Sequence, residues 1–278
     1  MNVVEFTALV FGVSSAAGFL GALTGMGGGV VIVPFLTLFM GADIRYAIGA
    51  SLVSVIATSS GAASAYVKEG FSNIRIGMFL EMATTLGALL GATLVALFPT
   101  AFIAVIFGVV LVYSAYLSAR SPRDSASSDQ PDPLAGRLQM DAAYPGPQGP
   151  VAYHVHAVPT GFSLMFVAGA LSGLLGIGSG AVKVLAMDRA MHIPFKVSTT
   201  TSNFMIGVTA AASAGVYLNR GYIDPGLAMP VMLGVLLGSL LGTLVLVRAR
   251  SRWLRLTFAL VILALGLEMI FNGLTGRL

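Results

Sequence analysis

The stretch GALTGMGGGVVIVPFL (residues 21–36) places three successive glycines, Gly27, Gly28 and Gly29, inside sequence that is otherwise apolar enough for a buried helix. Glycine is among the poorest helix formers, so this run predicts a break rather than the centre of a helix. The break leaves residues 26–41 as a separate apolar segment. That segment is shorter than the roughly 20 residues that a helix needs to cross a bilayer.

The composition of the chain points to a membrane protein. Hydrophobic residues make up 56% of its 278 residues, and charged residues only 9%. Apolar segments recur almost end to end, which is typical of a polytopic helical membrane protein. They lie near residues 3–22, 26–41, 46–66, 75–97 and 101–119, and near residues 159–175, 179–193, 197–218, 226–247 and 253–272. We therefore expect an all-α protein within the lipid bilayer, with about five membrane segments in each half.

A polar stretch separates the two sets of apolar segments. Residues 120–157 are rich in Ser, Asp, Pro and Gly, a composition that buries too little apolar surface to fold alone. We expect this stretch to be a flexible cytoplasmic linker. The expected domains are then a first membrane repeat at 1–119, the linker, and a second membrane repeat at 158–278.

The two halves have similar sequences around their glycines. Residues 17–34 set over residues 168–185 are identical at nine of 18 positions. For such a biased composition, chance would give roughly two identities. The aligned glycines, at an offset of 151, are Gly25 with Gly176, Gly27 with Gly178, and Gly29 with Gly180. The chain is therefore an internal duplication, which is a common plan for transporters.

Lys and Arg residues indicate how the two copies are oriented, because they gather on the cytoplasmic side of membrane proteins. If each half crosses the membrane an odd number of times, eleven of the 15 lie inside, three lie outside and Lys183 stays within the membrane. Four crossings per half would give seven on each side. The uneven split favours two inverted-topology repeats with both termini outside. It leaves open whether 3–22 with 26–41, and 159–175 with 179–193, cross fully or return as re-entrant hairpins.

The glycine runs predict a binding site between the halves. Short, glycine-interrupted segments at matching positions point to broken helices that meet near the midplane of the membrane. A helix that begins after such a break directs its free N–H groups and its positive dipole end into the site. We expect these residues to bind an anion: Gly27, Gly28, Gly29, Gly178, Ser179 and Gly180. Close helix packing is the alternative, and it is the role we expect for Gly87 with Gly91 and Gly238 with Gly242.

Lys183 strengthens the prediction of an anion site. A charge inside a membrane segment is costly unless it is paired or hydrated, so we expect its ammonium to bind the anion. The alternative is a lysine that snorkels to the interface. Ser51, Thr201 and Asn203 are further expected donors, although such polar side chains also bond to helix backbone or to neighbouring helices. The first half has Ile32 where the second has Lys183.

Glu81 lies about two turns inside its apolar segment, with Arg75 the nearest basic residue along the chain. We expect Glu81 to carry a proton during transport, and an interfacial or structural role is the alternative. The chain has no cysteine, and no span gathers the residues for metal or acid–base chemistry, so we expect no metal, no cofactor and no enzymatic activity. Its scattered net charge of +4 argues against nucleic acid as a partner.

The glycine motifs resemble those of the sulfite exporter TauE/SafE family, also known as TSUP membrane permeases. The resemblance rests on G-x-G-G-G followed by V-x-x-V-P-F-L, on A-x-G-A-S-L (residues 47–52), and on G-x-G-S-G and T-T-x-S-N in the second half. It implies transport of sulfite, thiosulfate, an organosulfonate or a related anion across the bacterial inner membrane.

We expect this transport to proceed by alternating access between the inverted halves. A non-transporting membrane module that assembles with another complex is the alternative. The sequence leaves open which anion is moved, in which direction and with which coupling ion. It also leaves open whether the chain forms a homo-oligomer.

Overall fold

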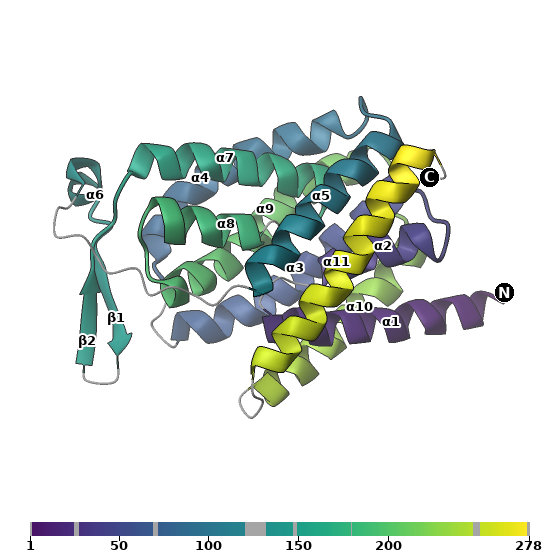
Figure 1. Cartoon of the computed structure of the whole chain (residues 1–278), viewed down its shortest axis with the longest axis horizontal. Coiled ribbons are helices and arrows are strands. Elements are labelled where there is room, and N and C mark those ends of the chain that lie inside the picture. The colour runs from purple at the N-terminus through teal and green to yellow at the C-terminus, as the bar shows by residue number, and fades with distance from the viewer. Residues whose placement is uncertain are drawn as a thin grey trace.

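Helices make up most of the structure, which is a computed structural model of the whole chain (Figure 1). It describes residues 2–24, 28–68, 72–119, 132–146, 149–178, 180–246 and 251–276. The first half contains α1 (Val3–Thr24), α2 (Gly29–Leu38), α3 (Ile44–Lys68), α4 (Ile74–Leu94) and α5 (Thr100–Ala119). The second half contains α7 (Val158–Leu175), α8 (Gly180–Leu185), the π-helix η1 (Ala186–Ala190), α9 (Phe195–Asn219), α10 (Pro225–Leu246) and α11 (Ser251–Thr275). A helix therefore lies at each apolar stretch of the sequence.

The described helices have the length and the surface of membrane helices. Among the described residues, four helical stretches are long and apolar enough to cross a bilayer, and they lie within α1, α4, α7 and α10. Shorter apolar helical stretches lie within α2, α3, α5 and α11. Large apolar side chains point outwards from them, and Leu86, Leu240 and Leu260 are 59%, 57% and 70% exposed. So much exposed apolar surface fits a lipid environment. The chain is a multi-pass helical membrane protein, as the sequence predicts.

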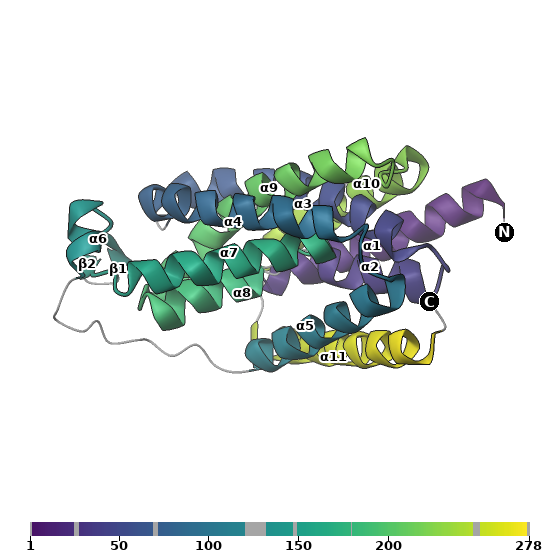
Figure 2. The same cartoon turned by 90° about the horizontal axis from the view of Figure 1, so that it is seen from above.

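The two halves pack on each other in a matching pattern. α1 packs along α10, and their counterparts in the other half, α7 and α4, pack along each other in the same way. α3 pairs with its counterpart α9, and α5 pairs with its counterpart α11. Figure 2 shows α5 and α11 as a separate pair beside the other helices. Each of these long helices is therefore held by a helix of the other half.

Glycines allow the close contact between α4 and α7 and between α1 and α10. A Cβ atom added to Gly87 or Gly91 would overlap the backbone of α7 near Ala170. One added to Gly238 would overlap the backbone of α1 at Ser15. Small residues at such positions let membrane helices approach closely. The packing role predicted for these three glycines is confirmed.

Two arginines join neighbouring segments at one end of the bundle. Arg45, at the start of α3, donates to the Phe98 carbonyl oxygen at 3.0 Å. Arg220, at the end of α9, donates to the Thr93 carbonyl oxygen at 3.0 Å. Both chain termini lie at this end, and residues 132–157 lie at the opposite end (Figure 1).

Each of the two glycine-interrupted regions forms a hairpin. The start of α2 lies beside α1, and a Cβ atom added to Gly28 would lie only 3.4 Å from the Cα atom of Gly18. Beyond η1, the Met191 carbonyl oxygen accepts a hydrogen bond from the His156 amide at 3.1 Å, and the Met191 side chain touches Gly161 near the start of α7. Both hairpins therefore turn back towards the end of the bundle where they begin (Figure 1).

The expectation that the linker lacks packed structure is wrong for residues 132–146 and 149–157. They form α6 (Pro133–Arg137) and an antiparallel hairpin of β1 (Ala142–Gly146) and β2 (Gly149–Tyr153). Met140 and Tyr153 are buried in an apolar cluster with residues of α4, α7, η1 and α9. Asn73, which caps α4, donates to the Tyr153 hydroxyl at 2.8 Å and to the Met140 carbonyl oxygen at 3.1 Å.

Residues 132–146 and 149–157 are packed because they lie against the end of the helix bundle. The composition of this segment argues only that it cannot fold alone, and the end of the helix bundle supplies the apolar surface that it lacks. Asp132 also joins the segment to the bundle, since its carboxylate accepts from the Leu134 amide in α6 and from the Val158 amide at the start of α7. Residues 120–131 lie outside the described part of the chain.

Candidate functional site

The first glycine turn, at Gly28 and Gly29 before α2, and the second, at Gly176 to Gly178 after α7, meet where α3 and α9 pack together. A Cβ atom on Gly29 would overlap Ser51 Oγ and lie 3.2 Å from Val55 Cγ2. A Cβ atom on Gly178 would lie 2.8 Å from Ile206 Cγ2 and 3.4 Å from Val55 Cγ1. Val55 on α3 therefore touches both turns, while Ile206, its counterpart at the offset of 151, touches the second one.

The turn after α7 has a backbone that requires glycine. Gly176 and Gly178 have φ angles of +66° and +71°, in the left-handed region that side chains with a Cβ atom disfavour. The Ser51 hydroxyl donates to the Gly176 carbonyl oxygen at 2.8 Å, so Ser51 fixes the end of α7. Ser202, its counterpart in the second half, donates to the Gly180 carbonyl oxygen at 3.4 Å. The predicted site residues Gly27 and Ser179 lie outside the described part of the chain.

Lys183 lies inside the bundle and contacts α9. Its ammonium donates to Thr209 Oγ1 at 2.6 Å, and the residue is 0% exposed. Ile206 and Thr209 are three residues apart and share one face of α9. The ammonium is therefore one helical turn from the point where the Gly178 turn touches α9. This position disagrees with a lysine that snorkels to the membrane interface.

Thr209 joins Lys183 to Glu81 on α4. The Thr209 hydroxyl donates to Glu81 Oε1 at 2.7 Å, and the Thr85 hydroxyl donates to the same oxygen at 3.2 Å. Glu81 is 8% exposed, and its Oε2 is buried without a hydrogen-bond partner among the described residues. We call Lys183, Thr209 and Glu81 the charged centre. It brings two predicted site residues together through a third that the sequence analysis missed.

The remaining predicted donors lie away from the charged centre. Thr201 Oγ1 accepts a hydrogen bond from the Asn73 amide at 3.0 Å and so contacts the start of α4. Asn203 is half-buried on α9, one turn before Gly207, whose added Cβ atom would overlap Ser59 Oγ of α3. Within the described ranges, no group of three or more Asp, Glu or His side chains could hold a metal ion.

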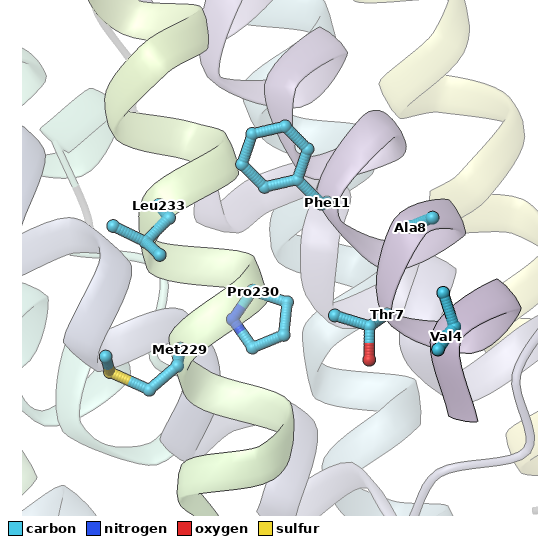
Figure 3. A pocket seen from close by; sticks show the side chains of 7 residues that line it. All are labelled: Val4, Thr7, Ala8, Phe11, Met229, Pro230 and Leu233. Atoms are coloured by element: carbon cyan, nitrogen blue, oxygen red, sulfur yellow. The ribbon is translucent and has the colours of Figure 1, made fainter.

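A separate crevice of about 520 Å³ lies between the N-terminal halves of α1 and α10. Figure 3 shows its lining, which is apolar apart from one threonine hydroxyl: Val4, Thr7, Ala8, Phe11, Met229, Pro230 and Leu233. It offers no charged group to a small anion. A surface of this kind suits lipid chains, so we do not place the substrate site there.

Comparisons with known proteins agree with a membrane protein. The chain is 27% identical over 269 residues to the probable membrane transporter protein YunE of Bacillus subtilis (strain 168), covering 93% of this chain and 95% of that protein. A probable membrane transporter protein of Xylella fastidiosa (strain 9a5c) is 24% identical over 95% of both chains. The probable membrane transporter protein YdhB of Bacillus subtilis (strain 168) is 25% identical over 79% of this chain and 80% of its own. No solved structure matches the chain.

The family match covers nearly the whole chain. The family described as "Sulfite exporter TauE/SafE" matches residues 10–269, a range that includes both glycine turns and the charged centre. The names of the family and of these relatives describe membrane transporters, not enzymes. The chain therefore belongs to the sulfite exporter TauE/SafE family.

Proposed function

We propose that this protein is a secondary permease that moves a small sulfur-containing anion, such as sulfite, thiosulfate or an organosulfonate, across the bacterial inner membrane. The observation that carries the proposal is the fully buried ammonium of Lys183, one helical turn along α9 from the point where the Gly178 turn touches that helix. A buried cation inside membrane helices is costly and typically marks a substrate or ion pathway. The description of the family as a sulfite exporter supports this class of anion.

We place the anion between the Lys183 ammonium and the two glycine turns. An ammonium has three N–H donors, and among the described residues Thr209 accepts one of them. Gly29 and Gly178 have no side chain, and Ser51, Val55 and Ile206 pack where a Cβ atom would stand, so an anion that enters would meet these side chains beside the backbone. Ser51 belongs to the site as the residue that fixes Gly176. We leave Thr201, predicted as a donor, outside this proposal, because its hydroxyl lies at the start of α4, where it accepts a hydrogen bond from the Asn73 amide.

Alternating access between inverted repeats is the mechanism that we propose. The matching contacts of α1 with α10 and α7 with α4 support two repeats, 1–119 and 158–278, related by a pseudo-twofold axis. Both hairpins turn back, which supports re-entrant segments rather than full crossings. The termini lie at one end of the bundle and residues 132–157 at the other, as inverted halves with an odd number of crossings require.

Cysteine labelling tests this topology, since the natural chain has no cysteine. We expect Thr275→Cys, near the end of α11, to react with an impermeant thiol reagent in intact cells. We expect Ala143→Cys, exposed on β1, to react only after the membrane is permeabilised. Labelling of Ala143→Cys in intact cells would contradict the proposed orientation.

Uptake into liposomes tests the function itself. Purified protein should carry ³⁵S-labelled sulfite or thiosulfate into liposomes faster than protein-free liposomes take it up, and chloride should compete weakly. A non-transporting module of another complex would give no flux with any sulfur-containing anion. Folding of the reconstituted protein would be checked by its thermal unfolding, so that absent flux is informative.

A further inference from the structure

The charged centre takes Lys183 and Thr209 from the second half and Glu81 from the first, and the position related to it by the duplication carries no charge. At the offset of 151, the counterparts of Lys183, Thr209 and Glu81 are Ile32, Thr58 and Met232. Ile32 is 1% exposed, so an apolar side chain fills the equivalent space in the first half. Helix packing at this position therefore does not need a charge. The two charges of the charged centre, Lys183 and Glu81, therefore need another explanation.

The charged centre is electrically neutral when no anion is bound. Lys183 contributes a positive charge and Glu81 a negative one, and the Thr209 hydroxyl links them by accepting from the first and donating to the second. Neutrality matters because an unpaired charge among buried side chains is strongly unfavourable. An ion that binds must therefore leave the total charge of the charged centre unchanged, because a net charge in this buried site is unfavourable.

Other ionisable side chains on the neighbouring helices do not take part in this balance. α7 carries none, and on η1 the Asp188 carboxylate and the Arg189 guanidinium approach each other at 3.6 Å. α9 carries Lys196 in its first turn and Tyr217 near its other end, where the Tyr217 hydroxyl donates towards α7 carbonyl oxygens. α5 carries Tyr113 and Tyr116, both more than 40% exposed.

We propose that the charged centre takes up one proton at Glu81 for each singly charged anion that binds to Lys183. This proposal rests on the proposed function. The bound anion neutralises the ammonium and leaves the Glu81 carboxylate uncompensated in a buried site, which favours its protonation. The proton enters from the same aqueous phase as the anion, where hydronium or a buffer acid releases it, and adds to Oε2, the oxygen that lacks a partner among the described residues, while Oε1 keeps its bonds to Thr209 and Thr85.

The total charge is then zero in both states. Without anion it is the sum of Lys183 and Glu81, and with anion it is the sum of Lys183 and the anion beside a neutral Glu81. The protein would therefore couple anion movement to proton movement in the same direction. A doubly charged anion such as thiosulfate would leave one excess negative charge, so we expect singly charged substrates to be preferred.

Simultaneous measurement of anion and proton flux tests this coupling. The protein is reconstituted into liposomes that contain a pH-sensitive dye, and the membrane potential is clamped with potassium and valinomycin. The probes are ³⁵S-labelled methanesulfonate, which has one negative charge near neutral pH, and ³⁵S-labelled thiosulfate, which has two. We expect methanesulfonate entry to acidify the lumen with one proton per anion.

Two variants assign the proton to its residue. We expect Glu81→Gln to exchange labelled for unlabelled methanesulfonate but to lose its proton flux, down to the level of protein-free liposomes. Glu268→Gln is the matched control, because Glu268 lies exposed on α11, and it should keep the wild-type ratio of protons to anions.

The outcomes separate this inference from the proposed function. Wild-type methanesulfonate flux without proton flux, or coupled flux that persists in Glu81→Gln, would overturn the inference and leave the permease standing. Transport of thiosulfate but not of methanesulfonate would overturn the preference for a single charge and with it the inference. Absence of flux with every sulfur-containing anion would remove the proposed function, on which the inference rests.

Discussion

Lys183→Met is expected to weaken sulfite binding to the purified protein by roughly ten- to a hundredfold. A hydrogen bond between a charged donor and its acceptor contributes about 1.5–3 kcal/mol, which corresponds to that range of affinity. Methionine keeps an unbranched apolar stem and removes the ammonium. Lys183→Arg should lose less affinity, although the planar guanidinium is larger than the ammonium and binds in a different geometry. Isothermal titration calorimetry with sulfite measures both variants.

Ile32→Met is the matched control for this variant. Ile32 occupies the position equivalent to Lys183 in the first half and is also buried, so the substitution alters packing without altering charge. We expect its sulfite affinity to stay close to that of the wild type. Equal affinities in the wild type and in Lys183→Met would exclude Lys183 from the anion site.

The same variant has an expected effect on stability. Breaking a buried charge pair by removing one partner typically costs about 3–5 kcal/mol, because the other charge is left unpaired. We therefore expect Lys183→Met and Glu81→Gln each to unfold at a lower temperature than the wild type, and the double variant to recover much of the loss. A double variant that is as unstable as the sum of the two single variants would show that the side chains act independently.

Gly178→Ala is expected to cause the second large loss, in both stability and transport. The left-handed backbone at Gly178 costs an alanine about 1–2 kcal/mol. Its Cβ atom would also lie 2.8 Å from Ile206 Cγ2, and such overpacking adds about 1–3 kcal/mol. The collision occurs where the turn meets α9, so sulfite flux should fall even in the fraction that remains folded.

Gly221→Ala separates the two contributions to this loss. Gly221 has almost the same φ angle, +73°, but an added Cβ atom would meet no atom within 4 Å. We expect Gly221→Ala to lose only the stability that the left-handed backbone costs an alanine, about 1–2 kcal/mol, and to transport normally. Thermal unfolding and flux of the two variants are compared directly, and equal losses would show that the contact with Ile206 has no role.

The helices and the close helix contacts could be predicted from the sequence because they depend on local patterns. Membrane segments follow from runs of apolar residues, and the duplication follows from glycines that recur at a fixed offset. Gly87, Gly91 and Gly238 could be assigned to packing because small residues four apart form one stripe on a helix. The glycine runs could be recognised as helix breaks from the local sequence alone, because glycine is among the poorest helix formers.

The charged centre depends on contacts between distant parts of the chain and could not be predicted. Thr209 lies 128 residues from Glu81 and 26 from Lys183, and no local pattern links them. Thr209 lies three and seven residues after Ile206 and Ser202 on one helical face, which is the signal that could have indicated it. The packing of Tyr153 could not be predicted either, because its partners belong to the helix bundle.

Counterflow of labelled sulfite in liposomes tests most directly that this chain carries an anion by way of Lys183. Liposomes loaded with unlabelled sulfite are diluted into a trace of ³⁵S-labelled sulfite, and a carrier then accumulates the label transiently above its external concentration. We predict this accumulation for the wild type and for Ile32→Met, and its absence for Lys183→Met reconstituted at the same density. A folded wild type that accumulates no label, or a Lys183→Met variant that accumulates as much as the wild type, would contradict the account.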